Sequence, residues 1–413
     1  MRKIAIILAA LAMLTACKST KTLLPNVSGK AGEVIVVIEK EDWEGKLGNK
    51  VRELLADDCP YLAQKEPLYT LVNVPHGSFG DLFKIHRNIV YFNIKDQIDS
   101  ARFVLRHDLW SHPQCVVQID APDADRAIAL LDKDASKVLN AIEQAERDRV
   151  ISNSIKYEER SLAPQVMEIF GGSPRFPMGY KLRKKTSDFV WIAYDQQTVM
   201  QDILIYSYPC LDDEPFSVES LVSHRNEILK ANVPGMFDNT WMTTSQAFPI
   251  TVSFLKYQGR SFAEMRGYWE VENDYMGGPF VSHAFFSRDG VDIIVAEAFV
   301  YAPKYDKRQY LRQTESILYS WDWDHTVDES PPHRQSFLYE YNGHQRKRYD
   351  GHCCAYWQVN AEIDIFHDQE GNEQQTYAHC GTDEVVFTYV AALADQPAEV
   401  RHAERNETYG SAD

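Results

Sequence analysis

Residues Arg260–His283 have the sequence RSFAEMRGYWEVENDYMGGPFVSH, and this stretch decides how the second half of the chain is expected to fold. We interpret Phe262–Glu270 as a β-strand and Asn273–Pro279 as a loop that leads into another strand, Phe280–Phe286. Two strands joined by a loop of this length form an antiparallel pair. The stretch therefore predicts the centre of an antiparallel sheet.

The flanking sequence extends this pattern in both directions. Further strands are expected before and after the pair, with one helix between them and a closing helix at Tyr305–Ser320. This order predicts a sheet with helices on one or both faces, and it resembles small modules of the PsbP and Mog1 kind. The other expected elements are strands at Tyr180–Arg183, Phe189–Tyr194, Ile203–Ser207, Thr251–Tyr257 and Val291–Phe299, and a helix at Ser217–Lys230.

The first half of the chain mixes strands and helices in a different order. Glu33–Glu39 (EVIVVIE) is a run of β-branched residues and predicts a strand, and Asn88–Ile94 (NIVYFNI) predicts another. A long helix is expected to begin at Asp123 and to end near Arg149. The fold class predicted for the whole chain is therefore α+β, with two mixed sheet-and-helix domains.

The amino terminus carries the features of an export signal. Arg2 and Lys3 precede an apolar run, Ile4–Leu14, which is followed by Thr15-Ala16-Cys17. The run is too short to span a bilayer, which takes about 20 apolar residues. A cysteine directly after small residues resembles the lipobox of bacterial lipoproteins, in which the cysteine becomes lipidated. The alternative is an ordinary secretory signal that contains a cysteine.

These observations predict a linear organisation in six parts. They are a lipoprotein signal peptide (1–16), a lipidated tether (17–31), a first α+β domain (32–150), a connection (151–178), a second α+β domain (179–323) and an acidic, largely irregular tail (324–413). Two or more acyl chains give stable anchoring, so we expect contact with a membrane through lipid on Cys17. No acidic cluster follows Cys17, which favours an outer-membrane location facing the periplasm.

Composition and motifs exclude several classes of function. A net charge of -17 argues against nucleic acid as a partner. The serine-hydrolase elbow, the HExxH helix, the P-loop, the dinucleotide-binding glycine pattern and the EF-hand loop are all missing from the sequence. Histidines and cysteines occur in the tail, but Cys353 and Cys354 are adjacent and no CxxC pair is present. We predict no metal site, no cofactor and no catalytic residue.

The hairpin at Arg260–His283 supplies the main candidate binding site. Because side chains alternate along a strand, Arg266 and Glu270 are expected on one face and Trp269 on the other. A loop with two glycines allows close approach of a ligand. One interpretation is a cleft for a polar or sugar-like ligand, with Trp269 as its platform. The other is a structural hairpin with a core tryptophan and a structural pair between Arg266 and Glu270. The candidate residues are Arg266, Trp269, Glu270, Asp274, Gly277 and Gly278.

A second candidate lies in the first domain. Trp43 and Arg87 are both near the ends of predicted strands and are expected to line one edge of the sheet. The alternative for Arg87, which follows His86, is an ion-pair anchor in front of a buried strand.

Several short motifs resemble a family of uncharacterised Bacteroidota envelope lipoproteins, the domain of unknown function 4837. The resemblance extends over residues 17–323 and implies a lipid-anchored envelope protein without implying an activity. The motifs are Leu24-Pro25, Ser28-Gly29, Glu33–Ile38, Trp43-Glu44-Gly45, Gln64-Lys65-Glu66-Pro67, His86-Arg87-Asn88-Ile89, Arg266-Gly267-Tyr268-Trp269-Glu270, Met276-Gly277-Gly278-Pro279-Phe280, Phe299-Val300-Tyr301-Ala302-Pro303 and Lys307-Arg308.

The expected function is that of a non-catalytic binding or assembly module with other envelope proteins as candidate partners. The alternative is an envelope hydrolase that acts on glycan or peptide through Glu270, Asp274 and Arg266. A third possibility is a purely structural link between membrane and wall. The hydrolase requires its carboxyl groups to face one cavity, about 5–10 Å apart for glycosides.

Overall fold

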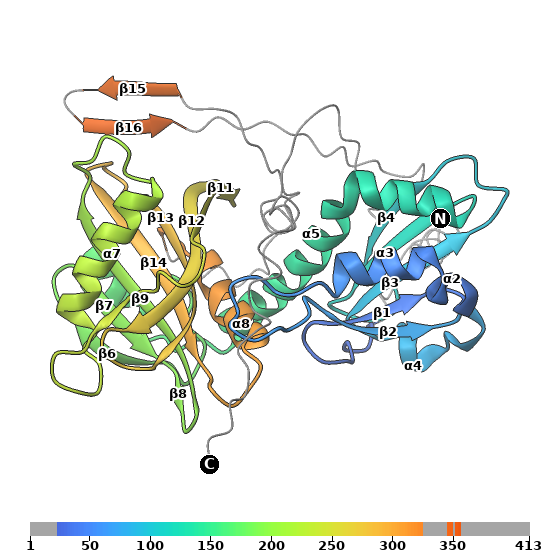
Figure 1. Cartoon of the computed structure of the whole chain (residues 1–413), viewed down its shortest axis with the longest axis horizontal. Helices are drawn as coiled ribbons and strands as arrows, with labels where there is room; N and C mark the ends of the chain where they lie inside the picture. Colours follow the sequence, from blue (N-terminus) through green and yellow to red (C-terminus); the bar gives the residue numbers. More distant parts are fainter. Residues whose placement is uncertain (1–22, 325–344, 350–351, 357–413) are drawn as a thin grey trace, which may run out of the picture.

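The protein is described by a computed structural model that covers residues 23–324, 345–349 and 352–356. Two large sheets, each packed with helices, form two domains, so the predicted α+β fold class is confirmed (Figure 1). The predictions for Cys17, for the signal peptide and for most of the tail concern residues outside these ranges.

The first domain contains a five-stranded sheet with the strand order β2-β1-β3-β5-β4. The pairs β1–β2, β1–β3 and β3–β5 are parallel, and only the β4–β5 pair is antiparallel. Parallel strands are usually covered on both faces, which explains the continuous valine and isoleucine runs in their sequences. The strands are β1 (Glu33–Val37), β2 (Thr70–Val74), β3 (Asn88–Ile94), β4 (Arg102–His107) and β5 (Cys115–Ala121).

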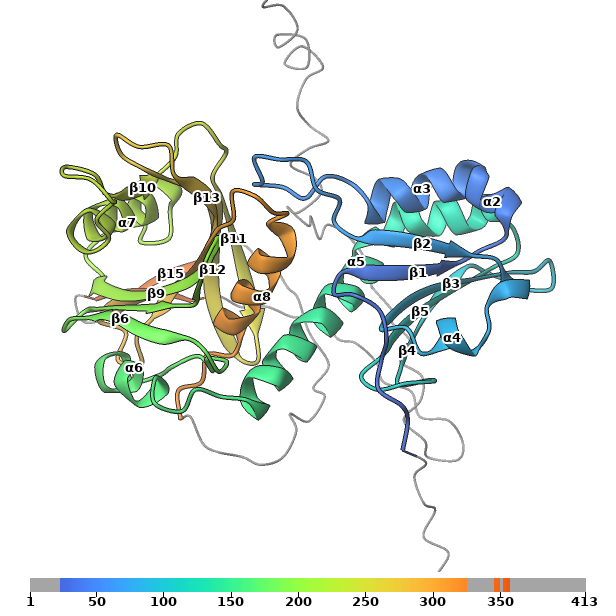
Figure 2. The ribbon, with the colours of Figure 1, turned by 90° about the horizontal axis from the view of Figure 1, so that it is seen from below.

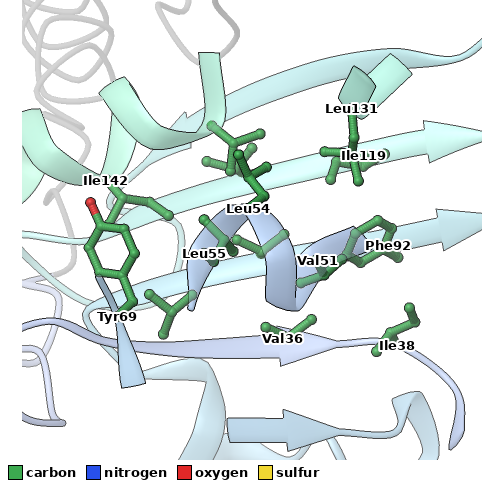
Figure 3. Packing of buried hydrophobic residues seen from close by; sticks show 14 of the residues in the cluster. Val36, Ile38, Val51, Leu54, Leu55, Tyr69, Phe92, Ile119, Leu131 and Ile142 are labelled. Atoms are coloured by element: carbon green, nitrogen blue, oxygen red, sulfur yellow. The ribbon is translucent and has the colours of Figure 1, made fainter. Parts of the chain in front are cut away.

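Two helices, α3 (Lys46–Leu55) and α5 (Ala124–Lys156), cover one face of this sheet. Figure 3 shows side chains from both helices meeting those of the strands in the larger core of the domain, where Val51 lies close to Phe92 and Leu131 to Ile119. A smaller core occupies the other face. The short elements of the domain are α2 (Lys40–Glu44), a 3-10 turn at His76–Ser78 and α4 (Asp81–Lys84).

Helix α5 is longer than predicted and reaches the second domain. The Asp123 carboxylate accepts a hydrogen bond from the Arg126 N–H at 2.8 Å, which caps the start of the helix as expected from the sequence. The helix continues past Arg149 to Lys156, because Ile151 is buried in a core of the second domain. The region 151–178 is therefore not a simple connection, and it also contains α6 (Ala163–Phe170).

The second domain contains a nine-stranded sheet in which every pair is antiparallel. The main path is β10-β12-β13-β14-β9-β7-β6, with β11 also paired to β12 and β8 to β9. The strands are β6 (Lys181–Lys185), β7 (Phe189–Ala193), β8 (Asp195–Gln196), β9 (Val199–Pro209), β10 (Met242–Thr244), β11 (Thr251–Tyr257), β12 (Arg260–Val271), β13 (Gly277–Phe286) and β14 (Asp292–Tyr301).

Helices cover both faces of the second sheet. Leu221 and Leu229 of α7 (Val218–Asn232) belong to the core on one face, and α6 and α8 (Arg308–Tyr319) contribute to the core on the other face. In Figure 2, α8 lies on the side toward the first domain, whereas α7 and β10 lie on the side away from it. Within the described residues, no helix has both the length and the apolarity needed to cross a membrane.

A short two-stranded sheet was not expected in the tail. Strands β15 (Gln345–Tyr349) and β16 (His352–Tyr356) pair antiparallel. This pairing adds regular structure to a tail that was predicted to be largely irregular.

The segment before β1 is attached to the first domain. The His112 N–H donates to the Pro25 carbonyl at 2.9 Å, and the Ser28 N–H donates to the Ile85 carbonyl at 2.8 Å. The Arg87 N–H in turn donates to the Ser28 carbonyl at 3.1 Å. The predicted tether of residues 17–31 is therefore too long, because its last residues are bonded to the folded body from Pro25 onward.

A carboxylate of the first domain holds the start of α8. Glu66, which is buried in the loop before β2, accepts hydrogen bonds from the backbone N–H groups of Lys307 and Arg308 at 2.7 and 2.8 Å. The residue at the N-cap position, Lys307, provides no side-chain cap. Since the first N–H groups of a helix lack partners within the helix, Glu66 satisfies two of them across the domain boundary.

We predict that Glu66→Ala lowers the free energy of unfolding by about 2 kcal/mol, because it leaves two buried N–H groups without an acceptor. Urea unfolding followed by circular dichroism measures this effect. The matched control is Glu53→Ala on the exposed side of α3, which should change stability by less than about 0.5 kcal/mol. Equal midpoints for the two variants would contradict a stabilising role for Glu66.

Candidate functional site

Trp269 lies in the core of the second domain and is not available as a platform for a ligand. The residue is buried, and its indole Nε1–H donates to the Val300 carbonyl at 3.2 Å. Its ring packs edge-on against Phe299, with centroids 5.4 Å apart. Gly278 is needed here for close packing, because a Cβ at that position would lie 2.0 Å from the Val300 oxygen. The structural interpretation of Trp269 and of Gly278 is therefore the correct one.

Arg266 is also buried, and its partners differ from the expected one. Its Nε donates to Glu264 Oε1 at 2.7 Å, and one terminal nitrogen donates to Glu315 Oε1 of α8 at 2.6 Å. The predicted partner on the same strand, Glu270, is half-buried and lies opposite Gly277 in the β12–β13 ladder. The guanidinium therefore joins the sheet to α8.

The remaining candidate of this hairpin, Asp274, has a local role. It lies in the loop between β12 and β13, where its Oδ1 accepts a hydrogen bond from the Tyr275 N–H at 2.6 Å. Together with the burial of Arg266 and Trp269, this means that the hairpin does not form the predicted cleft in which all of these side chains face one ligand.

The carboxylate of Glu264 is the centre of a buried polar cluster. Besides Arg266, it accepts a hydrogen bond from the Tyr319 hydroxyl at 2.9 Å, and His283 Nε2 lies 3.4 Å from Glu264 Oε2. Burial would raise the pKa of Glu264, but the charge of Arg266 and contact with His283 outweigh it and lower the pKa. Burial lowers the pKa of His283 to about 4, so its imidazole is neutral near pH 7.

A second ion pair continues this cluster into the first domain. Arg312 of α8 donates from Nε to Glu143 Oε2 of α5 at 3.1 Å, and the Tyr69 hydroxyl donates to the same carboxylate. Burial would raise the pKa of Glu143, whereas the charge of Arg312 outweighs it and lowers the pKa. The guanidinium of Arg147 on α5 lies 3.6 Å from the centroid of the Tyr319 ring. Charged side chains of α5 and α8 therefore connect the two domains at their junction.

Trp43 and Arg87 do not share an edge of the first sheet, so the second candidate site is corrected. Trp43 follows β1, Arg87 precedes β3, and these strands are parallel, which places the two residues at opposite ends. The ring of Trp43 is covered by the Arg52 guanidinium at 4.5 Å. Arg87 Nε lies 3.3 Å from the buried carboxylate of Glu146, which supports the ion-pair alternative.

Sequence reasoning missed three exposed apolar side chains at the β10 edge of the second sheet. Met236 and Phe237 lie in the loop between α7 and β10, and Tyr275 lies in the loop between β12 and β13. The available signal was an apolar pair inside a polar, breaker-rich segment, PGMFDN, at positions 234–239. Within the described residues, no group of three histidine, cysteine, aspartate or glutamate side chains is arranged to hold a metal ion.

Residues 159–320 match the model of a protein family described as Domain of unknown function (DUF4837). The second domain is a DUF4837 domain. Residues 27–154 match a second model, Domain of unknown function (DUF8532). The resemblance expected over residues 17–323 is therefore divided between two family models, and the DUF4837 domain covers only the later part. No curated protein matches the chain.

Solved structures resemble the chain only weakly. The Saccharomyces cerevisiae Ran-binding protein Mog1p is 10% identical, with 39% of this chain and 93% of that chain covered and a TM-score of 0.26. Human STARD10 is 8% identical, with 39% of this chain and 80% of that chain covered and a TM-score of 0.20. A Mog1 chain was the kind of match expected for the DUF4837 domain, but TM-scores this low carry no argument about binding.

The arrangement in the DUF4837 domain is suited to holding α8 and the first domain in place. Arg266 has both of its carboxylate partners within 3.3 Å, and Glu315 reaches it from α8. A buried arginine between two carboxylates stabilises one arrangement of the elements that carry these groups, because each charge depends on the others. Two groups proposed for catalysis in the hydrolase alternative are apart: Arg266 lies in the protein interior, and Asp274 lies in the loop between β12 and β13.

We predict that Arg266→Met lowers the free energy of unfolding by about 3–5 kcal/mol, because Glu264 and Glu315 then lack their buried partner. Urea unfolding at pH 7 measures the loss. The matched control is Arg288→Met after β13, whose guanidinium pairs with Asp324 where both side chains are exposed and should contribute about 1 kcal/mol or less. A small effect of Arg266→Met would contradict the central role of this arginine.

His283 makes stability depend on pH. Its folded pKa of about 4 lies below the ordinary value of 6.5, so the unfolded chain binds a proton more readily. The contribution of His283 to stability is therefore complete above pH 6.5 and is lost as the pH falls toward 4. We predict that His283→Phe flattens the fall in urea midpoint between pH 7 and 5. Parallel profiles for the wild type and His283→Phe would contradict this assignment.

Proposed function

We propose that this protein is a lipid-anchored, periplasm-facing module of the cell envelope that binds a partner and has no catalytic role. The observation that carries the proposal is that Arg266 and Trp269 are both buried and contact other parts of the protein. Arg266 pairs with Glu264 and Glu315, and Trp269 packs in the core. Of the three side chains that the hydrolase alternative needs, Arg266 is thus engaged in holding the fold.

A rigid junction between the domains supports a binding role. Arg312 with Glu143, and Glu66 with the start of α8, join elements of the two domains through buried groups. A body of two fixed domains can present a surface of constant shape, which reduces the entropic cost of binding.

The sequence around Cys17 supports the anchor. Seven residues, Lys18–Leu24, separate this cysteine from Pro25, the first residue bonded to the first domain. Even a fully extended chain of this length reaches only about 25 Å, at about 3.3–3.6 Å per residue. Lipid on Cys17 would therefore keep the first domain beside the membrane surface.

We predict that the wild-type protein incorporates an alkyne-labelled palmitate in cells and that Cys17→Ala abolishes this labelling. Cys210→Ala, at a half-buried cysteine of the second domain, is the matched control and should be labelled like the wild type. Label that persists in Cys17→Ala would contradict the proposed anchor.

The binding role is tested by crosslinking the tagged, lipidated protein in cells and identifying the crosslinked proteins by mass spectrometry. We expect one recurrent envelope protein that is lost when Cys17→Ala releases the body from the membrane. The hydrolase alternative is tested with purified protein on cell-wall glycan and peptide. Turnover that disappears in Glu270→Gln would overturn the non-catalytic proposal.

A further inference from the structure

Three exposed apolar side chains lie on two loops at the β10 edge of the second domain. The exposed fractions are 78% for Met236, 64% for Phe237 and 106% for Tyr275. Aromatic residues and methionine are the types most enriched in the centres of protein interfaces. We call these three residues the Phe237 surface.

The first of the two loops has a fixed backbone. The Gly235 N–H donates to the Thr240 carbonyl at 2.8 Å, and the buried Thr240 hydroxyl donates to the Phe237 carbonyl at 2.6 Å. The same hydroxyl accepts a hydrogen bond from the Phe237 N–H at 3.2 Å. Met236 and Phe237 are therefore held outward by a structured turn and do not owe their exposure to a loose loop.

The second loop is fixed against the first. The Glu272 N–H donates to the Trp241 carbonyl at 2.8 Å, and the Asn273 amide donates to the Asn239 carbonyl at 3.5 Å. Tyr275 follows directly, and its own N–H is held by Asp274. Because β10 and β12 are antiparallel neighbours, the loop before β10 and the loop after β12 lie at the same end of the sheet.

Acidic residues accompany the apolar ones. Asp238 lies beside Phe237 in the first loop, and Glu272 and Asp274 precede Tyr275 in the second. Asp238 and Glu272 are exposed and Asp274 is half-buried. Of the basic groups around the first loop, Lys230 lies over the ring of Trp241 at 4.5 Å, and Lys184 donates from Nζ to the Asn232 carbonyl at 3.1 Å. The Phe237 surface therefore has an apolar centre and a negative border.

We propose that the Phe237 surface is the docking site for a protein partner that offers an apolar pocket bordered by lysine and arginine side chains. The pocket would take up Phe237 and its apolar neighbours, and the basic border would face Asp238, Glu272 and Asp274. An anionic bilayer does not fit this pattern, because its negative charge would repel the same carboxylates.

This proposal rests on the proposed binding function and gives it a site and a partner chemistry. The location is consistent with such a role, since α7 and β10 lie on the side of the second domain that faces away from the first domain (Figure 2). The residues that the sequence singled out in the same hairpin, Arg266 and Trp269, hold the strand beneath, and the exposed loop at its end carries the contact.

The test places the photocrosslinker p-benzoylphenylalanine at position 237 of the full-length protein in cells. The matched control places it at Leu211, which is 86% exposed at the end of β9. We expect one protein adduct from position 237 and at least tenfold less of it from position 211. Urea midpoints equal to that of the wild type verify that both labelled proteins are folded.

Charge reversal tests the chemistry of the partner. Asp238→Lys/Glu272→Lys should reduce the adduct from position 237 at least tenfold, because the border then repels a basic pocket. Asp96→Lys/Asp99→Lys makes the same change in net charge at exposed positions of the first domain and should leave the adduct unchanged. An adduct of wild-type intensity in Asp238→Lys/Glu272→Lys would contradict a partner with a basic border.

A membrane is the rival occupant, and the purified protein body from residue 18 onward distinguishes it. Sedimentation with vesicles of phosphatidylglycerol and phosphatidylethanolamine that is lost in Phe237→Ser would assign the surface to lipid and overturn the proposal. A partner found by crosslinking the tagged protein, without any adduct at position 237, would refute the site and leave the binding function standing. Absence of a partner in both experiments would refute the binding function itself.

Discussion

The buried carboxylate of Glu66 under the first turn of α8 is the contact on which the arrangement of the two domains depends. A helix start needs acceptors for its free N–H groups, and the sequence at Lys307 provides none of its own. The acceptor comes from a loop of the first domain, so the start of α8 in the second domain is held by the first. From that position α8 directs Arg312 toward α5 and Glu315 toward the sheet. The buried polar cluster at the junction is therefore a consequence of how one helix begins.

Several short motifs that carry the family resemblance turn out to be contacts between distant parts of the chain. The segment at positions 64–67 meets Lys307 and Arg308, because Gln64, Glu66 and Pro67 all accept hydrogen bonds from these two residues. Gly29 has a φ of +88°, and a Cβ there would lie 2.1 Å from the His86 ring. This close approach requires glycine and lets His86 reach Glu33. The motifs at positions 28–29, 64–67, 86–89 and 307–308 thus hold distant segments of the fold together.

Local sequence was sufficient for most of the fold. The strands at Asn88–Ile94 and Thr251–Tyr257 were predicted with their observed bounds, because β-branched and aromatic runs determine them locally. Helix α6 and the last turns of α5 were missed, since their stability comes from packing on the second core. The roles of Arg266 and Trp269 were not predictable for a similar reason. One partner of Arg266, Glu315, is 49 residues away on α8, and nothing near position 266 indicates it. Alternation along β12 still placed Arg266 and Trp269 on opposite faces, as the two separate sets of contacts require.

The bonded segment at Pro25–Gly29 determines where the proposed lipid anchor would be joined to the folded body. It runs beside His112 and His86, which lie three and two residues before the starts of β5 and β3, so the chain leaves the body where the parallel strands begin. A lipid on Cys17 would thus draw the beginnings of these strands toward the bilayer and turn their ends toward the aqueous space. Membrane attachment at this point would place the N-terminal ends of the parallel strands nearer the bilayer than their C-terminal ends. A protein that approaches along the membrane plane would then meet the edge strands of the sheet.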